Sequence, residues 1–196
     1  MLKSVSQRAA AALDRLIDAL VDERRRERAV LLLLAAYCAV WSLYGAISKA
    51  SQDIHYDMGE AVVWSREALL GNPKHPPLSA WVPWAWFKVF PTADWAYYLL
   101  CIVLATLALW VAWKIAERFL SPEKRVAGLA LLTLVPFFNF LALKYNANSV
   151  LVPLWALTTW AFLVSFETRK IAAALAGLAA AAAMLGKYWS ATCSPG

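Results

Sequence analysis

Five long apolar runs constrain how this chain can fold. The runs 29–47, 95–116 and 126–143 are each long enough to cross, as helices, the roughly 30 Å hydrocarbon core of a bilayer. The runs 150–166 and 171–186 are slightly shorter, and a short charged turn between them lets each span separately. We therefore predict an all-α fold, a polytopic transmembrane helix bundle of about five spans.

Composition agrees with a membrane location. Hydrophobic residues make up 62% of the chain and charged residues 16%, whereas a soluble domain is about half apolar and about a quarter charged. Many of the 11 tryptophans lie where an apolar run meets a charged loop, at the depth where amphipathic rings are enriched. The net charge of +6 lies mostly in short segments beside the apolar runs. This pattern is typical of membrane topology, and we expect no nucleic-acid partner.

Basic residues are divided unequally between the two predicted sides of the membrane. With a cytoplasmic N-terminus, thirteen of the 19 Lys and Arg residues lie inside, in segments 1–28, 114–125 and 169–170, and six lie outside. Cytoplasmic loops carry the excess of basic residues in membrane proteins. The N-terminus is therefore predicted to be cytoplasmic, and loops 48–94 and 144–149 are predicted to face outward.

Residues 1–28 form a basic, amphipathic segment before the first apolar run. Leu13, Leu16, Ile17 and Leu20 recur at helical spacing. This pattern favours a cytoplasmic helix that lies on anionic lipid headgroups over a helix that binds a protein partner.

The first outward loop contains a series of acidic residues. Asp53, Asp57, Glu60, Trp64 and Glu67 share one face if this stretch is helical. We expect an amphipathic juxtamembrane helix with its carboxylates at the water boundary. Bringing several carboxylates close together costs free energy, so such a cluster needs a reason. One reason is catalysis, in which a carboxylate acts as a general base and removes a proton from a hydroxyl. A solvated polar face with Asp53 as a helix cap is the alternative, and these residues alone leave both open.

A rigid turn follows the acidic segment. Residues 71–78 contain a glycine and three prolines, which prevent a helix. Lys74 and His75 within this turn could contact a phosphate, although a single loop histidine is commonly just solvated. The tryptophan-rich stretch 80–90 then returns the chain to the membrane interface.

These motifs, in this order, resemble those of GT-C membrane glycosyltransferases of the dolichyl-phosphate-mannose–protein mannosyltransferase type (glycosyltransferase family 39-like). Bacterial relatives include the lipid A aminoarabinose transferase and the transferases that decorate the lipopolysaccharide core. The matching residues are Tyr56-Asp57-Met58-Gly59-Glu60, Lys74-His75-Pro76-Pro77-Leu78-Ser79-Ala80-Trp81, Lys144-Tyr145-Asn146-Ala147-Asn148 and Leu185-Gly186-Lys187-Tyr188. The acidic residue followed by (Lys/His)-Pro-Pro-Leu is the most specific of these matches.

The resemblance implies a sugar transfer by inverting displacement. The implied donor is a polyprenyl-phosphate-linked sugar, and the acceptor is a lipid, glycan or protein on the outer side of the membrane. Asp57 matches the catalytic base of the family, Glu60 is the second acid, and Lys187 falls near the lipid phosphate. Asn148 stands where several relatives have an acid, which weakens the case for metal binding in that loop. A divalent metal stays an open alternative as cofactor, and no metal ligand is assigned. The residues expected to contact substrate are Asp53, Lys74, His75, Lys187 and Tyr188.

The resemblance also suggests a domain organisation. Residues 29–190 match the N-terminal part of a longer transmembrane glycosyltransferase domain, which places the protein in the bacterial inner (plasma) membrane. Residues 1–28 precede this part as the cytoplasmic helix, and residues 191–196 are expected to be a truncated tail. The alternatives are a non-catalytic membrane fragment and a transporter or flippase-like bundle. Acids in a loop, and not within a span, argue against a transporter.

The unequal distribution of basic residues predicts the topology. A reporter fused after Arg125 should report the cytoplasm, and one fused near Asn72 should report the outer side. Alkaline phosphatase and a fluorescent protein, which are active on opposite sides of the membrane, would measure this. Both positions on the same side would show that the assignment of spans is wrong.

Overall fold

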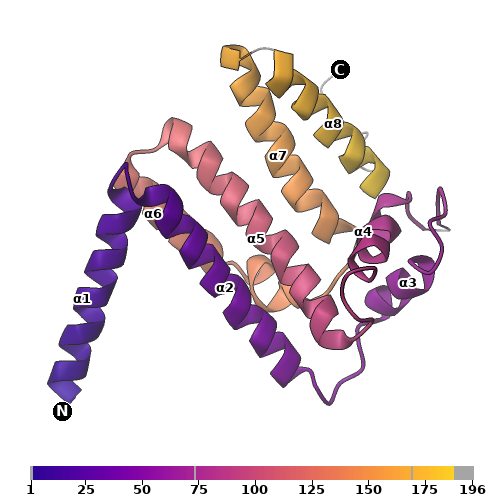
Figure 1. Cartoon of the computed structure of the whole chain (residues 1–196), viewed down its shortest axis with the longest axis horizontal. Helices are drawn as coiled ribbons and strands as arrows, with labels where there is room; N and C mark the ends of the chain where they lie inside the picture. The colour runs from indigo at the N-terminus through magenta and orange to yellow at the C-terminus, as the bar shows by residue number, and fades with distance from the viewer. Residues whose placement is uncertain (1, 73, 169, 188–196) are drawn as a thin grey trace.

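The computed structural model describes residues 2–72, 74–168 and 170–187. Within these residues the regular secondary structure is helical throughout (Figure 1). The predicted all-α fold is therefore confirmed.

Three helices of the described chain are long and apolar enough to cross a membrane. They are α2 (Arg26–Ser48), α5 (Asp94–Phe119) and α7 (Ala147–Thr168), and α8 (Lys170–Gly186) is a shorter apolar helix. These four helices match the predicted first, second, fourth and fifth runs. Their termini differ from the predicted limits by only a few residues, because apolar composition changes sharply at the flanking charged residues.

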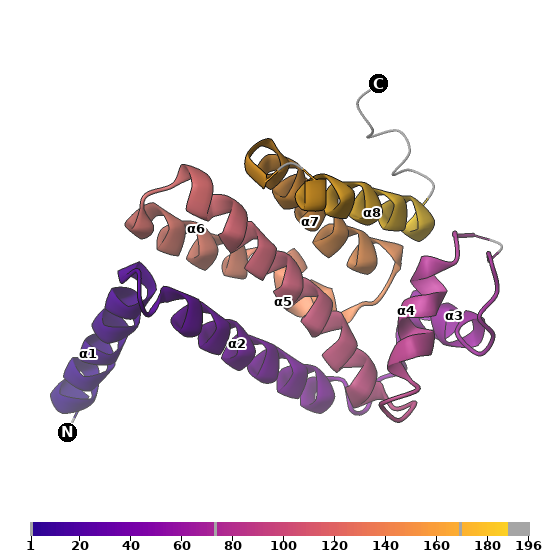
Figure 2. The ribbon, with the colours of Figure 1, turned by 45° about the horizontal axis from the view of Figure 1, so that its top comes forward.

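Helix α5 lies at the centre of the bundle. It packs against α2 on one side and against α7 on the other, and α7 packs along α8 (Figures 1 and 2). Of the three candidate spans, α5 has the most buried surface. Apolar side chains such as Leu32 and Ile47 of α2 and Phe162 of α7 remain exposed on the outside of the bundle, as lipid-facing residues do.

The run 126–143 is not one continuous helix, and this expectation was wrong. Helix α6 (Pro122–Leu134) ends early, and two short 3₁₀ helices, η1 (Pro136–Phe138) and η2 (Phe140–Leu143), complete the run. Pro136 causes the interruption, because proline has no N–H and excludes the residue before it from the helical region. Val135 accordingly has φ −69° and ψ 124°.

Asn139 pairs the backbone groups that this interruption leaves open. Its side-chain amide donates to the carbonyls of Thr133 and Val135, both at 3.1 Å, and its Oδ1 accepts the N–H of Phe140 at 2.7 Å. The Tyr37 hydroxyl of α2 donates to the Phe138 carbonyl at 2.8 Å. These bonds pair backbone groups that the interruption would otherwise leave open among apolar helices.

The interrupted run still carries the chain back to the end of the bundle where α5 begins. Leu143, the last residue of η2, packs between α2 and α5. A Cβ at Gly45 of α2 would lie 2.6 Å from Leu143 Cδ2 and 3.2 Å from Tyr98 Cβ. Glycine thus permits the close approach of three segments at this position.

Ion pairs join the helices at the opposite end of α5. Glu117 lies 2.7 Å from Lys114, 3.2 Å from Arg125 of α6 and 3.4 Å from Arg26 of α2. Arg125 is buried, and its guanidinium lies 5.0 Å from the centre of the Trp113 ring. One carboxylate thus connects three helices where the apolar spans end.

The N-terminal amphipathic helix is present as α1 (Leu2–Val21). It ends at Val21, and the carboxylate of the next residue, Asp22, accepts the N–H groups of Arg24 and Arg25 at 2.8 and 3.1 Å. The chain turns there, and the basic residues from Arg26 onward belong to α2.

The acidic segment forms a shorter helix than predicted. Helix α3 (Tyr56–Trp64) has nine residues, so Asp53 and Glu67 lie outside it and the expected continuous acidic face does not form. The side chain of His55, and not Asp53, caps the helix by accepting the Asp57 N–H at 3.2 Å. The proline-containing turn is not helical at residues 71, 72 and 74–77, as predicted, whereas Leu78, the last residue of the predicted turn, begins α4 (Leu78–Trp86).

The packing at Gly45 gives a test of the fold. Gly45→Val should lower the free energy of unfolding by about 1–3 kcal/mol, because the added methyl groups collide with Leu143 and Tyr98. Gly177→Ala in α8 is the control, since a Cβ there meets no atom within 4 Å. Unfolding in mixed micelles would measure both variants. A Gly45→Val protein as stable as wild type would contradict this packing.

A charged cavity at one end of the bundle

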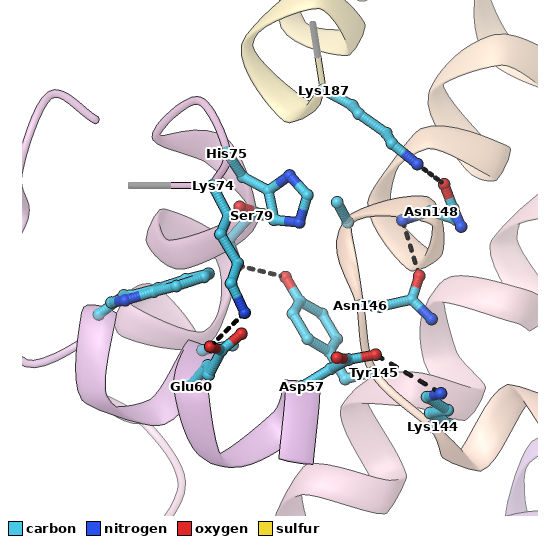
Figure 3. Close-up of a pocket in the computed structure, with 13 residues that line it drawn as sticks. Asp57, Glu60, Lys74, His75, Ser79, Lys144, Tyr145, Asn146, Asn148 and Lys187 are labelled. Carbon is cyan, nitrogen blue, oxygen red and sulfur yellow. Dashed lines mark hydrogen bonds and ion pairs between the residues drawn. The ribbon is translucent and has the colours of Figure 1, made fainter. Parts of the chain in front are cut away.

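Four segments far apart in the sequence enclose one cavity of about 330 Å³ (Figure 3). They are α3, the turn before α4 with the start of α4, the loop before α7 with the start of α7, and the residue that follows α8. The lining residues are Asp57, Glu60, Ala61, Trp64, Lys74, His75, Ser79, Lys144, Tyr145, Asn146, Ala147, Asn148 and Lys187.

Each carboxylate of the cavity has a lysine partner. Glu60 Oε1 lies 2.5 Å from Lys74 Nζ, and Asp57 Oδ2 lies 3.5 Å from Lys144 Nζ (Figure 3). Asp57 and Glu60 are three residues apart on α3 and therefore lie on the same side of this helix. The Asp57 pair is the longer one, so its carboxylate is held less tightly than that of Glu60.

The charges of the cavity shift the pKa values of its residues. The hydrogen bond from Lys74 lowers the pKa of Glu60, and the same bond raises the pKa of Lys74. Burial, followed by the positive charge of Lys187, lowers the pKa of His75. At pH 7, Glu60 is therefore ionised and His75 is neutral. The His75 ring also packs edge-on against Trp64, with ring centres 6.1 Å apart.

Lys187 is held by an amide and not by an acid. Its Nζ donates to Asn148 Oδ1 at 3.0 Å, and the Asn148 N–H donates to Asn146 Oδ1 at 2.8 Å. Within the described part of the chain, Lys187 forms no ion pair with a carboxylate. Its positive charge is therefore available to an anionic group that enters the cavity.

The floor of the cavity depends on the hydroxyl of Tyr145. This hydroxyl donates to the Ser79 carbonyl at 2.7 Å, and both residues are buried. In a regular helix the Ser79 carbonyl would accept the N–H of residue 83, but Pro83 of α4 has none. Tyr145 supplies the missing donor and thereby joins the loop before α7 to the first turn of α4.

A second tyrosine attaches α3 to the central helix. The Tyr97 hydroxyl of α5 donates to the Met58 carbonyl at 3.4 Å, and the rings of Tyr97 and Tyr145 lie 5.4 Å apart. Met58 is itself buried in the same apolar cluster. The two tyrosines thus position α3 and α4 at the N-terminal end of α5.

The cavity brings together five of the residues that the sequence identified: Asp57, Glu60, Lys74, His75 and Lys187. Asp53 is exposed and does not line the cavity. Tyr188 lies outside the described residues.

Sequence reasoning missed other lining residues. Lys144 was named as a charge that sets topology and as part of the motif 144–148, and Trp64 as a member of the acidic face. Neither was predicted as a site residue, yet both line the cavity. The motif 144–148 was the available signal for Lys144 and its neighbours.

Among the described residues, no group of three or more His, Cys, Asp or Glu side chains is placed to hold a metal ion. Asp57 and Glu60 therefore do not form such a site by themselves.

A helical membrane bundle with a charged cavity at one end is the class of protein that the fold and site define. A model of the dolichyl-phosphate-mannose-protein mannosyltransferase family matches residues 74–195, which is more than half of the 196 residues. The chain belongs to this family of membrane glycosyltransferases. No curated protein and no solved structure matches it. The matched region includes Lys74, His75 and Lys187 and begins after α3, which carries Asp57 and Glu60.

The hydrogen bond from Tyr145 predicts a stability effect. Tyr145→Phe removes the donor to a buried carbonyl, so the free energy of unfolding should fall by about 1–3 kcal/mol. Tyr44→Phe is the matched control, because Tyr44 is 47% exposed. Unfolding in mixed micelles would compare the two variants. Equal stability of both would show that the Ser79 carbonyl does not need the Tyr145 hydroxyl.

Proposed function

We propose that this protein transfers a sugar from a polyprenyl-phosphate-linked donor to a lipid, glycan or protein acceptor on the outer side of the membrane. The convergence of Asp57, Glu60, Lys74, His75 and Lys187 in one cavity supports this proposal most strongly. Family membership supports it as well. The proposed setting is the bacterial inner (plasma) membrane with a cytoplasmic N-terminus.

Asp57 acts as the general base in the proposed reaction. Its carboxylate accepts the proton of the acceptor hydroxyl while the acceptor oxygen attacks the anomeric carbon of the donor. The bond between this carbon and the phosphate oxygen breaks, the configuration inverts, and the lipid phosphate leaves with the bonding electron pair. The loose contact of Asp57 with Lys144, at 3.5 Å, leaves carboxylate oxygens accessible to a hydroxyl.

The cations of the cavity serve the donor phosphate in this proposal. Lys187 offsets the negative charge that develops on the leaving group, and its contact with Asn148 directs the ammonium toward the cavity (Figure 3). Neutral His75 is a hydrogen-bonding group beside it. Lys74 is paired with Glu60 at 2.5 Å, so its contribution to phosphate binding is shared with that carboxylate.

Glu60 has the role of orienting the acceptor. Its hydrogen bond with Lys74 lowers its pKa and therefore its basicity, which makes it the weaker candidate for proton removal. A carboxylate in this position can still accept a hydrogen bond from an acceptor hydroxyl. Substrate contacts by Asp53 and Tyr188 stay predictions.

Replacing the three acids separates their roles. Asp57→Asn keeps the size of the side chain but removes the proton acceptor, so turnover should fall on the order of 10²–10⁴-fold. Donor binding should be largely retained. Glu60→Gln should cost less, and Asp53→Asn, outside the cavity, is the matched control and should cost least. Transfer from radiolabelled polyprenyl-phosphate mannose, at matched membrane expression, would measure turnover.

Two results would contradict parts of this proposal. Wild-type turnover of Asp57→Asn with an inactive Glu60→Gln would assign the base to Glu60. Full activity of all three variants would mean that the acids only form a solvated surface.

A further inference from the structure

A second groove lies beside the charged cavity and shares no lining residue with it. It has a volume of about 330 Å³ and lies between the C-terminal ends of α3 and α4. Arg66 and Lys88 are its charged residues, and both are exposed. Glu67 and Asp94, the acids nearest to these residues in the sequence, do not line the groove.

The groove therefore carries two positive charges without a compensating acid. Neither Arg66 nor Lys88 forms an ion pair within the described part of the chain. Lys88 Nζ lies 5.5 Å from the centre of the Trp84 ring, which holds the ammonium at the groove wall. Two unpaired cations within one groove favour an anionic ligand with several acceptor oxygens, such as a phosphate.

An apolar groove of about 420 Å³ adjoins the basic one. Trp84 lines both grooves, so they meet at this side chain. The apolar groove is formed by Leu78, Trp81, Val82, Trp84 and the exposed Ala85 of α4, together with Ala68.

The surroundings of the two grooves are also apolar. Leu70 is 85% exposed and Val89 is 79% exposed. Clusters of exposed apolar and aromatic residues at the end of a bundle are typical of contact with the membrane interface.

We infer that these two grooves together bind a phosphate-bearing lipid of the outer leaflet. The phosphate lies between Arg66 and Lys88, and an acyl chain lies along the apolar groove. A free phosphate ion would use only the basic half, whereas a phospholipid accounts for both halves. This inference does not depend on the proposed transfer reaction, because the lipid site is separate from the charged cavity.

Native mass spectrometry of the whole protein in detergent, titrated with phosphatidylglycerol, tests the basic half. Arg66→Gln with Lys88→Gln should weaken lipid binding at least about tenfold, because each cation contributes to phosphate binding. Lys124→Gln with Lys170→Gln is the charge-matched control, since both residues are exposed, line neither groove and lie outside the N-terminal segment 1–28. Wild-type affinity of the first double variant, or an equal loss in both, would overturn the site.

Two further measurements test that the ligand is a lipid. Ala85→Glu places a charge in the apolar groove and should weaken phosphatidylglycerol binding, whereas Val63→Glu, an exposed site outside both grooves, should not. Millimolar inorganic phosphate should not displace the lipid. Displacement by phosphate, or an unchanged affinity of Ala85→Glu, would show that the groove binds a free anion and not a lipid.

Discussion

The structure depends on one constraint: backbone N–H and C=O groups among apolar helices must find hydrogen-bond partners within the protein, because no water is available there. Two of the prolines that break the regular helical pairing are Pro136, after α6, and Pro83, inside α4. A side chain repairs each break: Asn139 pairs the carbonyls before Pro136, and Tyr145 pairs the Ser79 carbonyl that Pro83 leaves open. The second repair also builds the cavity, since it fixes the loop before α7 against α4.

Charges are confined to the two ends of the bundle and have different uses there. At the end of α5 that is predicted to be cytoplasmic, Glu117 is surrounded by three cations from three helices, an arrangement that holds helices together. At the other end, pairing is incomplete. Glu60 and Asp57 each meet one lysine, and Lys187 meets only an amide. An open cavity with an uncompensated cation is suited to receive an anionic substrate, whereas the Glu117 cluster is not.

Much of the fold could be predicted because apolar length and charge are local properties. The spans at α2, α5, α7 and α8 followed from their composition. The prediction failed at the run 126–143, where one proline outweighed an apolar composition that suits a helix. It also failed at Asp53 and Glu67, because helical spacing holds only within a helix and α3 ends at nine residues. Charge and periodicity do not set the end of so short a helix; the His55 cap and the turn at Ser65 do.

The sequence by itself determined that this is a helical membrane protein, and it identified the motifs of a glycosyltransferase. It also named five of the charged or titratable residues of the cavity, since these recur in short patterns. Only the tertiary structure decided that Lys144 pairs with Asp57, that Asp53 stays outside, and that Lys187 meets Asn148. The partners in these pairs are far apart along the chain. They meet because α3 and the loop before α7 pack together through a buried cluster that contains Tyr97 of α5 and Tyr145 of that loop, and a spacing pattern does not encode such long-range packing.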